Sequence, residues 1–209
     1  ATIVAAHERF GTTGLMATLI TDRPEVTEAA IEAVASVELP GLLGLHLEGP
    51  HIAPARKGTH DPALIRPMEA RDLSLLLSAA RRLPHLMVTL APESVTLAQV
   101  AALADAGVVV SLGHSDCDLG TARAYADAGA RMVMHLYNAM SQLGHRAPGL
   151  VGAALSDGRL AAGLIADGFH VEDAALGIAL RGKAGPAGMF LVSDAMATVG
   201  SPIRGFTLN

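Results

Sequence analysis

The sequence predicts an α/β fold in which buried parallel strands alternate with amphipathic helices. Seven apolar runs are too short for helices and are bounded by turn or polar residues, which is typical of buried strands. They lie at 14–20, 42–47, 86–91, 108–112, 132–136, 161–166 and 189–192. Helical patterns separate these runs, as parallel neighbours require, because a crossover must bring the chain back to the starting edge of the sheet.

The expected helices repeat apolar residues at i, i+3, i+4 and i+7. The chain opens in a helical pattern at 1–10, and the full spacing occurs at 26–37, 73–80 and 97–104. Gly107 and Gly129 each stand between a helical pattern and the next strand, where a left-handed residue lets the chain reverse.

The helix at 26–37 has the clearest predicted beginning. Asp22 and Glu25 have the spacing of a capping box, and Pro24 falls in the first turn. We therefore expect the Asp22 side chain to cap this helix.

The strands are expected to close into a TIM-type (β/α)8 barrel. No glycine-rich phosphate fingerprint follows the first strand, and polar residues end nearly every strand instead of gathering at one switch point. Seven runs are one strand short of eight, and 209 residues are fewer than the roughly 250 typical of this fold. The chain also begins without methionine. We therefore expect residues 1–209 to be one domain, an incomplete barrel from a truncated or longer protein, with no internal boundary.

Composition excludes several classes of protein. With 51% hydrophobic and 17% charged residues, the chain is globular. Fifteen Lys and Arg against 20 Asp and Glu are interspersed, so no nucleic-acid partner is expected. The longest uncharged stretch, 132–145, is short of the roughly 18 residues of a membrane span. The lone Cys117 cannot form an internal disulfide and no leader opens the chain, which indicates a cytoplasmic protein.

Acids and imidazoles dominate the carboxyl ends of the expected strands. They are Glu48, Glu93, His114, His135 with Asn138 after it, Asp167 with His170 after it, and Asp194. In a barrel these ends meet at one mouth, and the 21-residue spacing of His114 and His135 places them on neighbouring strands. Two neutral imidazoles with Glu48 form the three-ligand set of a catalytic zinc site, with one position left for water. Asp194 is then a candidate base beside that water.

Each of these residues also has a structural interpretation. Glu48 can accept turn amides before Gly49 and Pro50, Asp194 can cap the next helix, and a single strand histidine is more often structural than metal-binding. His46 shares a strand face with Glu48 and is a possible ligand or, as we favour, an interior barrel residue. No constellation is evident around His7, His51 and His85. The joint occurrence of acids and imidazoles at one end of successive strands favours the metal site.

Eight short runs, in order along nearly the whole chain, resemble a single family. They are Gly-Leu-His-Leu-Glu-Gly-Pro at 44–50, Lys-Gly-Thr-His-Asp-Pro at 57–62, Thr-Leu-Ala-Pro-Glu at 89–93, Gly-His-Ser at 113–115, His-Leu-Tyr-Asn-Ala-Met at 135–140, Arg-Ala-Pro-Gly at 146–149, Ala-Asp-Gly-Phe-His-Val at 166–171 and Ser-Asp-Ala at 193–195. Together they resemble the N-acetylglucosamine-6-phosphate deacetylases of the amidohydrolase superfamily. The runs at 135–140 and 166–171 are the most specific.

The resemblance implies a role for each matching residue. Glu48, His114 and His135 are similar to the ligands of a divalent metal, usually zinc, and Asp194 to the catalytic acid and base. His60 is similar to a histidine that contacts the substrate beside the scissile acetamide and assists catalysis.

The remaining matches concern the substrate and the assembly. Asn138, Ala139, Arg146 and His170 are similar to residues that hold the sugar phosphate. In the family, part of the phosphate site comes from the second subunit of a homodimer, so a homodimer is expected.

Two segments of the family pattern are missing. The family begins with a small β-rich segment and a first barrel strand with a His-x-His or a variant, and ends with a substrate loop and more β structure. The seven strands of this chain are similar to strands two through eight. The number of metal ions therefore stays open.

The activity implied is metal-dependent hydrolysis of N-acetyl-D-glucosamine 6-phosphate to glucosamine 6-phosphate and acetate, in amino-sugar catabolism. One alternative is another amidohydrolase, acting on N-acyl groups or on cyclic amides as dihydroorotase does. Cyclic-amide hydrolases typically use a carboxylated lysine on a strand end, whereas Lys57 and Lys183 lie in loop-like contexts. Another alternative is a non-catalytic partial barrel, whose unpaired strand edges invite association.

Overall fold

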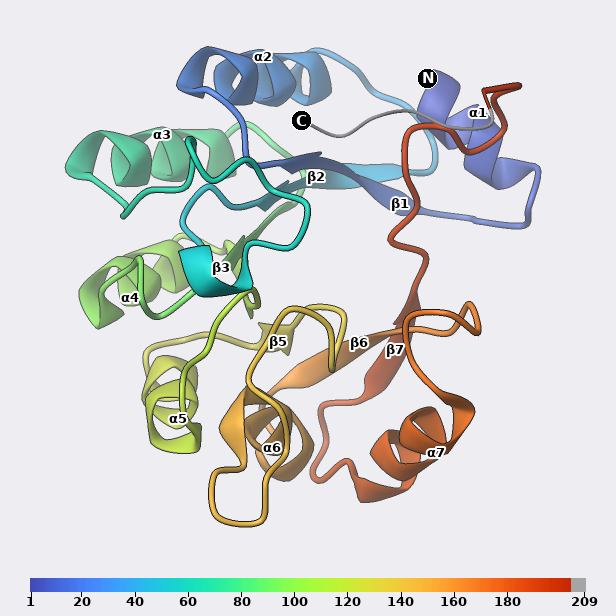
Figure 1. The fold of residues 1–209 in the computed structure, drawn as a ribbon. Helices are drawn as coiled ribbons and strands as arrows, with labels where there is room; N and C mark the ends of the chain where they lie inside the picture. The colour runs from blue at the N-terminus through green and yellow to red at the C-terminus, as the bar shows by residue number, and fades with distance from the viewer. Residues whose placement is uncertain (204–209) are drawn as a thin grey trace.

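The computed structural model describes residues 1–203 as one curled, parallel sheet with helices around its outer side (Figure 1). The strands are β1 (Leu15–Ile20), β2 (Leu42–Glu48), β3 (Leu86–Leu90), β4 (Val109–Leu112), β5 (Met132–Val133), β6 (Ala161–Ile165) and β7 (Met189–Val192). All seven pair in chain order, each parallel to the next. The α/β prediction is confirmed, and the sheet is a half-barrel consistent with part of a TIM barrel.

Helices connect the strands on the convex side of the sheet (Figure 1). They are α2 (Pro24–Ala35), α3 (Ala70–Ala80), α4 (Leu97–Asp105), α5 (Leu119–Asp127), α6 (Gly149–Ser156) and α7 (Asp173–Gly182). Helix α1 (Thr2–Glu8) precedes β1, and the short 3-10 turn η1 (Pro54–Arg56) belongs to the loop after β2. None of the helices within residues 1–203 has both the length and the apolar character needed to cross a bilayer.

The two faces of the sheet carry different side chains because alternate strand residues point to opposite sides. Leu47, Val88 and Leu112 belong to the apolar core that also contains residues of the helices. His46 instead bonds across the strands, with Nδ1 3.1 Å from Thr18 Oγ1 and Nε2 2.8 Å from Thr89 Oγ1. Both ring nitrogens are thus bonded to hydroxyl groups, as expected for an interior residue.

Two local predictions are wrong. Arg23, not Asp22, is the N-cap of α2, and within residues 1–203 Asp22 accepts a hydrogen bond only from the adjacent Arg23 N–H. No capping box forms there, since Asp22 lies one residue too early. The run at 132–136 is a strand only at 132–133, because His135 has a positive φ of 31°, which ends the extended backbone.

The two edges of the sheet are β1 and β7. Leu191 on β7 is 72% exposed, unlike the buried residues of the central strands. The segment after β7 runs past β1 to α1 (Figure 1), where a Cβ on Gly200 would lie 3.2 Å from Ala6 Cβ. Within residues 1–203, this irregular segment lies across the opening of the half-barrel.

Candidate metal centre

Three buried side chains meet at the carboxyl ends of the strands. Glu48 is the last residue of β2, and His114 and His135 follow β4 and β5. Glu48 Oε1 lies 2.7 Å from His114 Nε2 and 3.2 Å from His135 Nε2, and the two Nε2 atoms are 3.1 Å apart. Ligands bound tetrahedrally to zinc at about 2.0–2.1 Å are roughly 3.3 Å apart, so these three atoms have nearly the spacing that one ion requires.

The tautomer of His114 also fits a metal ligand. His114 Nδ1 lies 2.8 Å from the carbonyl oxygen of Arg56, and because a carbonyl only accepts, Nδ1 carries the proton. His114 Nε2 is the atom that faces the Glu48 carboxylate, at 2.7 Å. A proton or a metal ion between these two atoms holds them together, and Nε2 is the nitrogen left for a metal ion to bind. A histidine that donates its other N–H to a carbonyl is a common arrangement around metals.

The cluster shifts the pKa of its own members. Burial would raise the pKa of Glu48, but hydrogen bonds from His114, His135 and His60 outweigh it and hold that pKa far below its usual range. Burial would lower the pKa of His135, but its hydrogen bond to Glu48 and the charges of Glu48 and Asp194 raise it. The carboxylate is thus ionised and attracts a positive charge into a buried space.

Left-handed backbone is concentrated around the cluster. His114 (φ 48°), His135 (φ 31°), Tyr137 (φ 79°), Ala139 (φ 47°) and Asp194 (φ 46°) have positive φ values without being glycine. This conformation is unfavourable for residues with a side chain and is found preferentially at functional sites. All five follow the strands β4, β5 or β7.

The loop after β2 encloses His114. Ala53 N–H donates to the His114 carbonyl at 2.9 Å, and the left-handed Gly58 lies so close that a Cβ would be 3.3 Å from the His114 ring. Arg56 fastens this loop to the one after β4 through an ion pair with Asp116 at 2.7 Å. The bracing role of Arg56 was not predicted, because its contact lies 60 residues away in sequence.

Glu93, one of the strand-end acids, braces the same region. Its carboxylate accepts from Ser115 Oγ at 2.8 Å and from Asp116 N–H at 2.7 Å. It thus stabilises the turn directly after His114.

His60 is the fourth side chain in the cluster. It is 2% exposed, its Nε2 lies 3.6 Å from Glu48 Oε1, and its ring packs edge-on against His114 with centroids 4.6 Å apart. The structure therefore brings together the three ligand candidates and His60.

The other candidate residues are Asn138, His170, Arg146 and Asp194. Asn138 is three residues after His135, and its side-chain amide donates to the carbonyl of His135 at 3.3 Å. His170 is exposed and bonds to Asp167 at 2.7 Å, while Arg146 is exposed in the loop before α6. Asp194 is exposed after β7, and its charge acts on His135.

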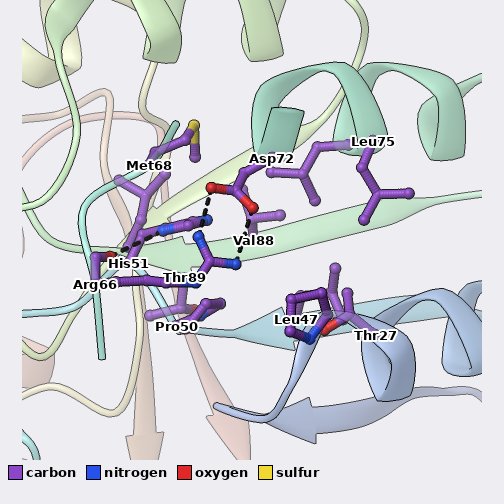
Figure 2. Close-up of a pocket in the computed structure, with 14 residues that line it drawn as sticks. Thr27, Leu47, Pro50, His51, Arg66, Met68, Asp72, Leu75, Val88 and Thr89 are labelled. Carbon is purple, nitrogen blue, oxygen red and sulfur yellow. Dashed lines mark hydrogen bonds and ion pairs between the residues drawn. The ribbon is translucent and has the colours of Figure 1, made fainter. Parts of the chain in front are cut away.

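A separate pocket lies on the opposite side of β2. It is lined by Leu47 and Val88 and by residues of α2 and α3 (Figure 2). There Arg66 forms a bidentate ion pair with Asp72, and His51 Nδ1–H donates to the Arg66 carbonyl at 3.0 Å. His51 is thus a buried structural histidine, apart from the Glu48 cluster.

A parallel β/α half-barrel with a buried Glu-His-His cluster at the carboxyl ends of its strands defines a protein of the amidohydrolase type. No protein-family model matches the chain. It is 43% identical over 202 residues to the N-acetylgalactosamine-6-phosphate deacetylase of Shewanella sp. (strain ANA-3), covering 95% of this chain and 50% of the relative. It is 42% identical over 202 residues to the human N-acetylglucosamine-6-phosphate deacetylase, covering 91% and 49%.

Solved structures of deacetylases also match the chain. The N-acetyl-D-glucosamine-6-phosphate deacetylase of Mycobacterium smegmatis matches with a TM-score of 0.87 and 35% identity, covering 97% of this chain and 54% of that one. The Pasteurella multocida N-acetylglucosamine-6-phosphate deacetylase matches with a TM-score of 0.86 and 32% identity, covering 94% and 52%. The chain is therefore a homologue of the N-acetylglucosamine- and N-acetylgalactosamine-6-phosphate deacetylases of the amidohydrolase superfamily. It spans about half the length of the curated relatives it matches.

Proposed function

We propose that the protein hydrolyses the acetamide of N-acetyl-D-glucosamine 6-phosphate, with Glu48, His114 and His135 holding one divalent metal ion, most simply zinc. The observation that carries the proposal is the convergence of Glu48 Oε1, His114 Nε2 and His135 Nε2, which lie 2.7–3.2 Å from one another in a buried site. The names of the relatives supply the substrate class.

The reaction must overcome two barriers, because water is a poor nucleophile and the amide nitrogen is a poor leaving group. A divalent ion, when bound, polarises the carbonyl and makes water more acidic. The remaining proton transfers fall to side chains of the protein.

We assign those transfers to Asp194. Its carboxylate accepts a proton as the water oxygen bonds to the carbonyl carbon, and it then delivers that proton to the nitrogen as the carbon-nitrogen bond breaks. The products are acetate and glucosamine 6-phosphate. The effect of the Asp194 charge on His135 and its left-handed φ of 46° support a place beside the cluster.

The other roles follow from the same substrate. His60 donates a hydrogen bond to the carbonyl oxygen, where negative charge develops. Asn138, Ala139, Arg146 and His170 bind the sugar phosphate, and Arg146 suits phosphate because its guanidinium binds two oxygens at once. In this proposal the enzyme is a cytoplasmic homodimer, and the second subunit completes the phosphate site.

The epimeric N-acetyl-D-galactosamine 6-phosphate is a second candidate substrate. It is favoured by the Shewanella relative, which is named for that sugar and is 43% identical. A cyclic-amide substrate is disfavoured, because the ammonium groups of Lys57 and Lys183 bond to backbone carbonyls of Gly58, Asp157 and Ala184.

Acetate release tests the proposal. The protein is assayed with both phosphorylated epimers, with unphosphorylated N-acetyl-D-glucosamine and with dihydroorotate, before chelation, after it and after zinc is returned. We expect phosphorylated sugar alone to be hydrolysed, with activity lost on chelation and restored by zinc. Equal turnover of the unphosphorylated sugar, hydrolysis of dihydroorotate, or turnover that survives complete metal removal would each contradict the proposal.

A further inference from the structure

We propose that Thr21 is a positioning residue that fixes the proton of neutral His60 on Nε2, the nitrogen that faces Glu48. This makes His60 a hydrogen-bond donor in the site and excludes it from the metal ligands. The inference rests on the proposed function for its catalytic consequence, but the proton position itself can be measured without turnover.

Thr21 directly follows β1, and both of its polar groups reach the same nitrogen of His60. Its backbone N–H lies 3.3 Å from His60 Nδ1, and its Oγ1 lies 2.7 Å from the same atom. Thr21 is 6% exposed and His60 2% exposed, so water does not compete for these bonds. The contact spans 39 residues of sequence.

The direction of these bonds follows from the backbone. An amide N–H only donates, so His60 Nδ1 must accept and cannot carry a proton. The Thr21 hydroxyl, which can rotate, then donates to the same lone pair at 2.7 Å. A neutral imidazole has one N–H, which is therefore on Nε2, 3.6 Å from Glu48 Oε1.

His60 and His114 consequently have opposite tautomers although their rings are in contact. A backbone carbonyl, that of Arg56, fixes the proton of His114 on Nδ1 and leaves Nε2 available to a metal ion. The Thr21 amide at 3.3 Å and the shorter bond from its hydroxyl at 2.7 Å together hold the proton of His60 on Nε2, so loss of the stronger hydroxyl bond should release it. One ring is thus prepared to bind a cation and the other to donate to an oxygen that gains negative charge.

Gly49 leaves room for this arrangement. It has a φ of 77°, and a Cβ built on it would collide with Thr21 Oγ1 and lie 3.5 Å from His60 Nδ1. A side chain at this position would displace the threonine hydroxyl from the histidine.

Nitrogen-15 NMR of the histidine rings tests the proposal, because protonated and unprotonated ring nitrogens have widely separated shifts. The zinc-loaded protein and its zinc-free form are labelled at histidine, and the His60 signals are assigned by their loss in His60→Gln. The variants are Thr21→Val, which removes the hydroxyl at constant shape, and Thr21→Ser, which keeps it.

Thr18→Val is the matched control. It makes the same substitution three residues earlier, on β1, and it removes a similar 3.1 Å contact to the Nδ1 of a different buried histidine, His46. A purely structural effect of losing a threonine hydroxyl from this part of the chain should therefore appear in both valine variants.

We expect wild-type His60 to be protonated at Nε2 and unprotonated at Nδ1. Thr21→Val should give a mixture of tautomers and a kcat lower by about tenfold or more, with KM and zinc content unchanged, since orientation of an oxyanion donor is affected. Thr21→Ser should keep the wild-type tautomer and the wild-type kcat. Thr18→Val should leave the His60 signals as in the wild type.

A proton on Nδ1 of wild-type His60 overturns the proposal, even if Thr21→Val fails to fold. A wild-type tautomer in folded Thr21→Val overturns it as well. Absence of acetate release from the wild type would refute the proposed function, but it would leave the measured tautomer and its dependence on Thr21 standing.

Discussion

Lowering the pH from 7.5 to 5 should cost the protein about 2 kcal/mol of folding free energy through one buried side chain, His46. Burial is the largest influence on this ring and lowers its pKa from 6.5 to about 4, against the attraction of Glu48. The two hydroxyl groups that bond to it, Thr18 Oγ1 and Thr89 Oγ1, offer no charge that would stabilise an imidazolium.

The sign follows from the direction of the pKa change. The unfolded chain protonates His46 near pH 6.5, whereas the folded protein does so only near pH 4, so stability is complete above 6.5 and is lost as the pH falls toward 4. At 1.36 kcal/mol per pH unit the full loss is about 3.4 kcal/mol, and at pH 5 it is about 2 kcal/mol.

The assay is urea unfolding of the zinc-free protein at both pH values. Chelation keeps metal release out of the comparison. His46→Gln is the reference, because glutamine retains a donor and an acceptor but does not titrate in this range. We expect the wild type to lose about 2 kcal/mol more than His46→Gln between pH 7.5 and pH 5. The same pH dependence in both proteins would refute a neutral, buried His46.

Three further predictions concern other parts of the molecule. Asp194→Asn should keep its zinc but lose acetate release by at least about 100-fold, because an amide cannot accept the proton; loss of metal in this variant would contradict the assigned role. Leu112→Ala, at a fully buried position, should lower the free energy of unfolding by about 2–5 kcal/mol in urea titrations, whereas Leu191→Ala, at a side chain 72% exposed, should change it by less than about 0.5 kcal/mol. Burial raises the pKa of Cys117 to about 11, so a thiol reagent at pH 8 should label it only after unfolding, and fast labelling of the native protein would disagree.

The strands could be predicted from sequence because the apolar runs of a parallel sheet are buried on both faces. All seven predicted runs contain a strand, with most bounds within one residue. No amphipathic pattern in the sequence predicts helix α6, because seven of its eight residues, 149–155, are buried and leave no polar face. The shortening of β5 depends on the left-handed His135, which tertiary contacts enforce and local pattern does not reveal.

The proximity of Glu48, His114 and His135 could be predicted because parallel strands bring their carboxyl ends to one side of the sheet. The hydrogen bonds that determine which ring nitrogens of His114 and His60 carry a proton could not be predicted from the sequence. The Arg56 carbonyl lies 58 residues from His114 and the Thr21 amide 39 residues from His60, and both partners are backbone groups that every residue carries. No residue type marks such a contact in the sequence.

The central claim is that Glu48, His114 and His135 hold one ion, and zinc analysis after extensive dialysis tests it most directly. His51→Gln is the control, since His51 is an equally buried histidine that bonds to the Arg66 carbonyl on the other side of β2. We predict bound zinc in the wild type and in His51→Gln and none in His135→Ala. Zinc at the wild-type level in folded His135→Ala would contradict the account.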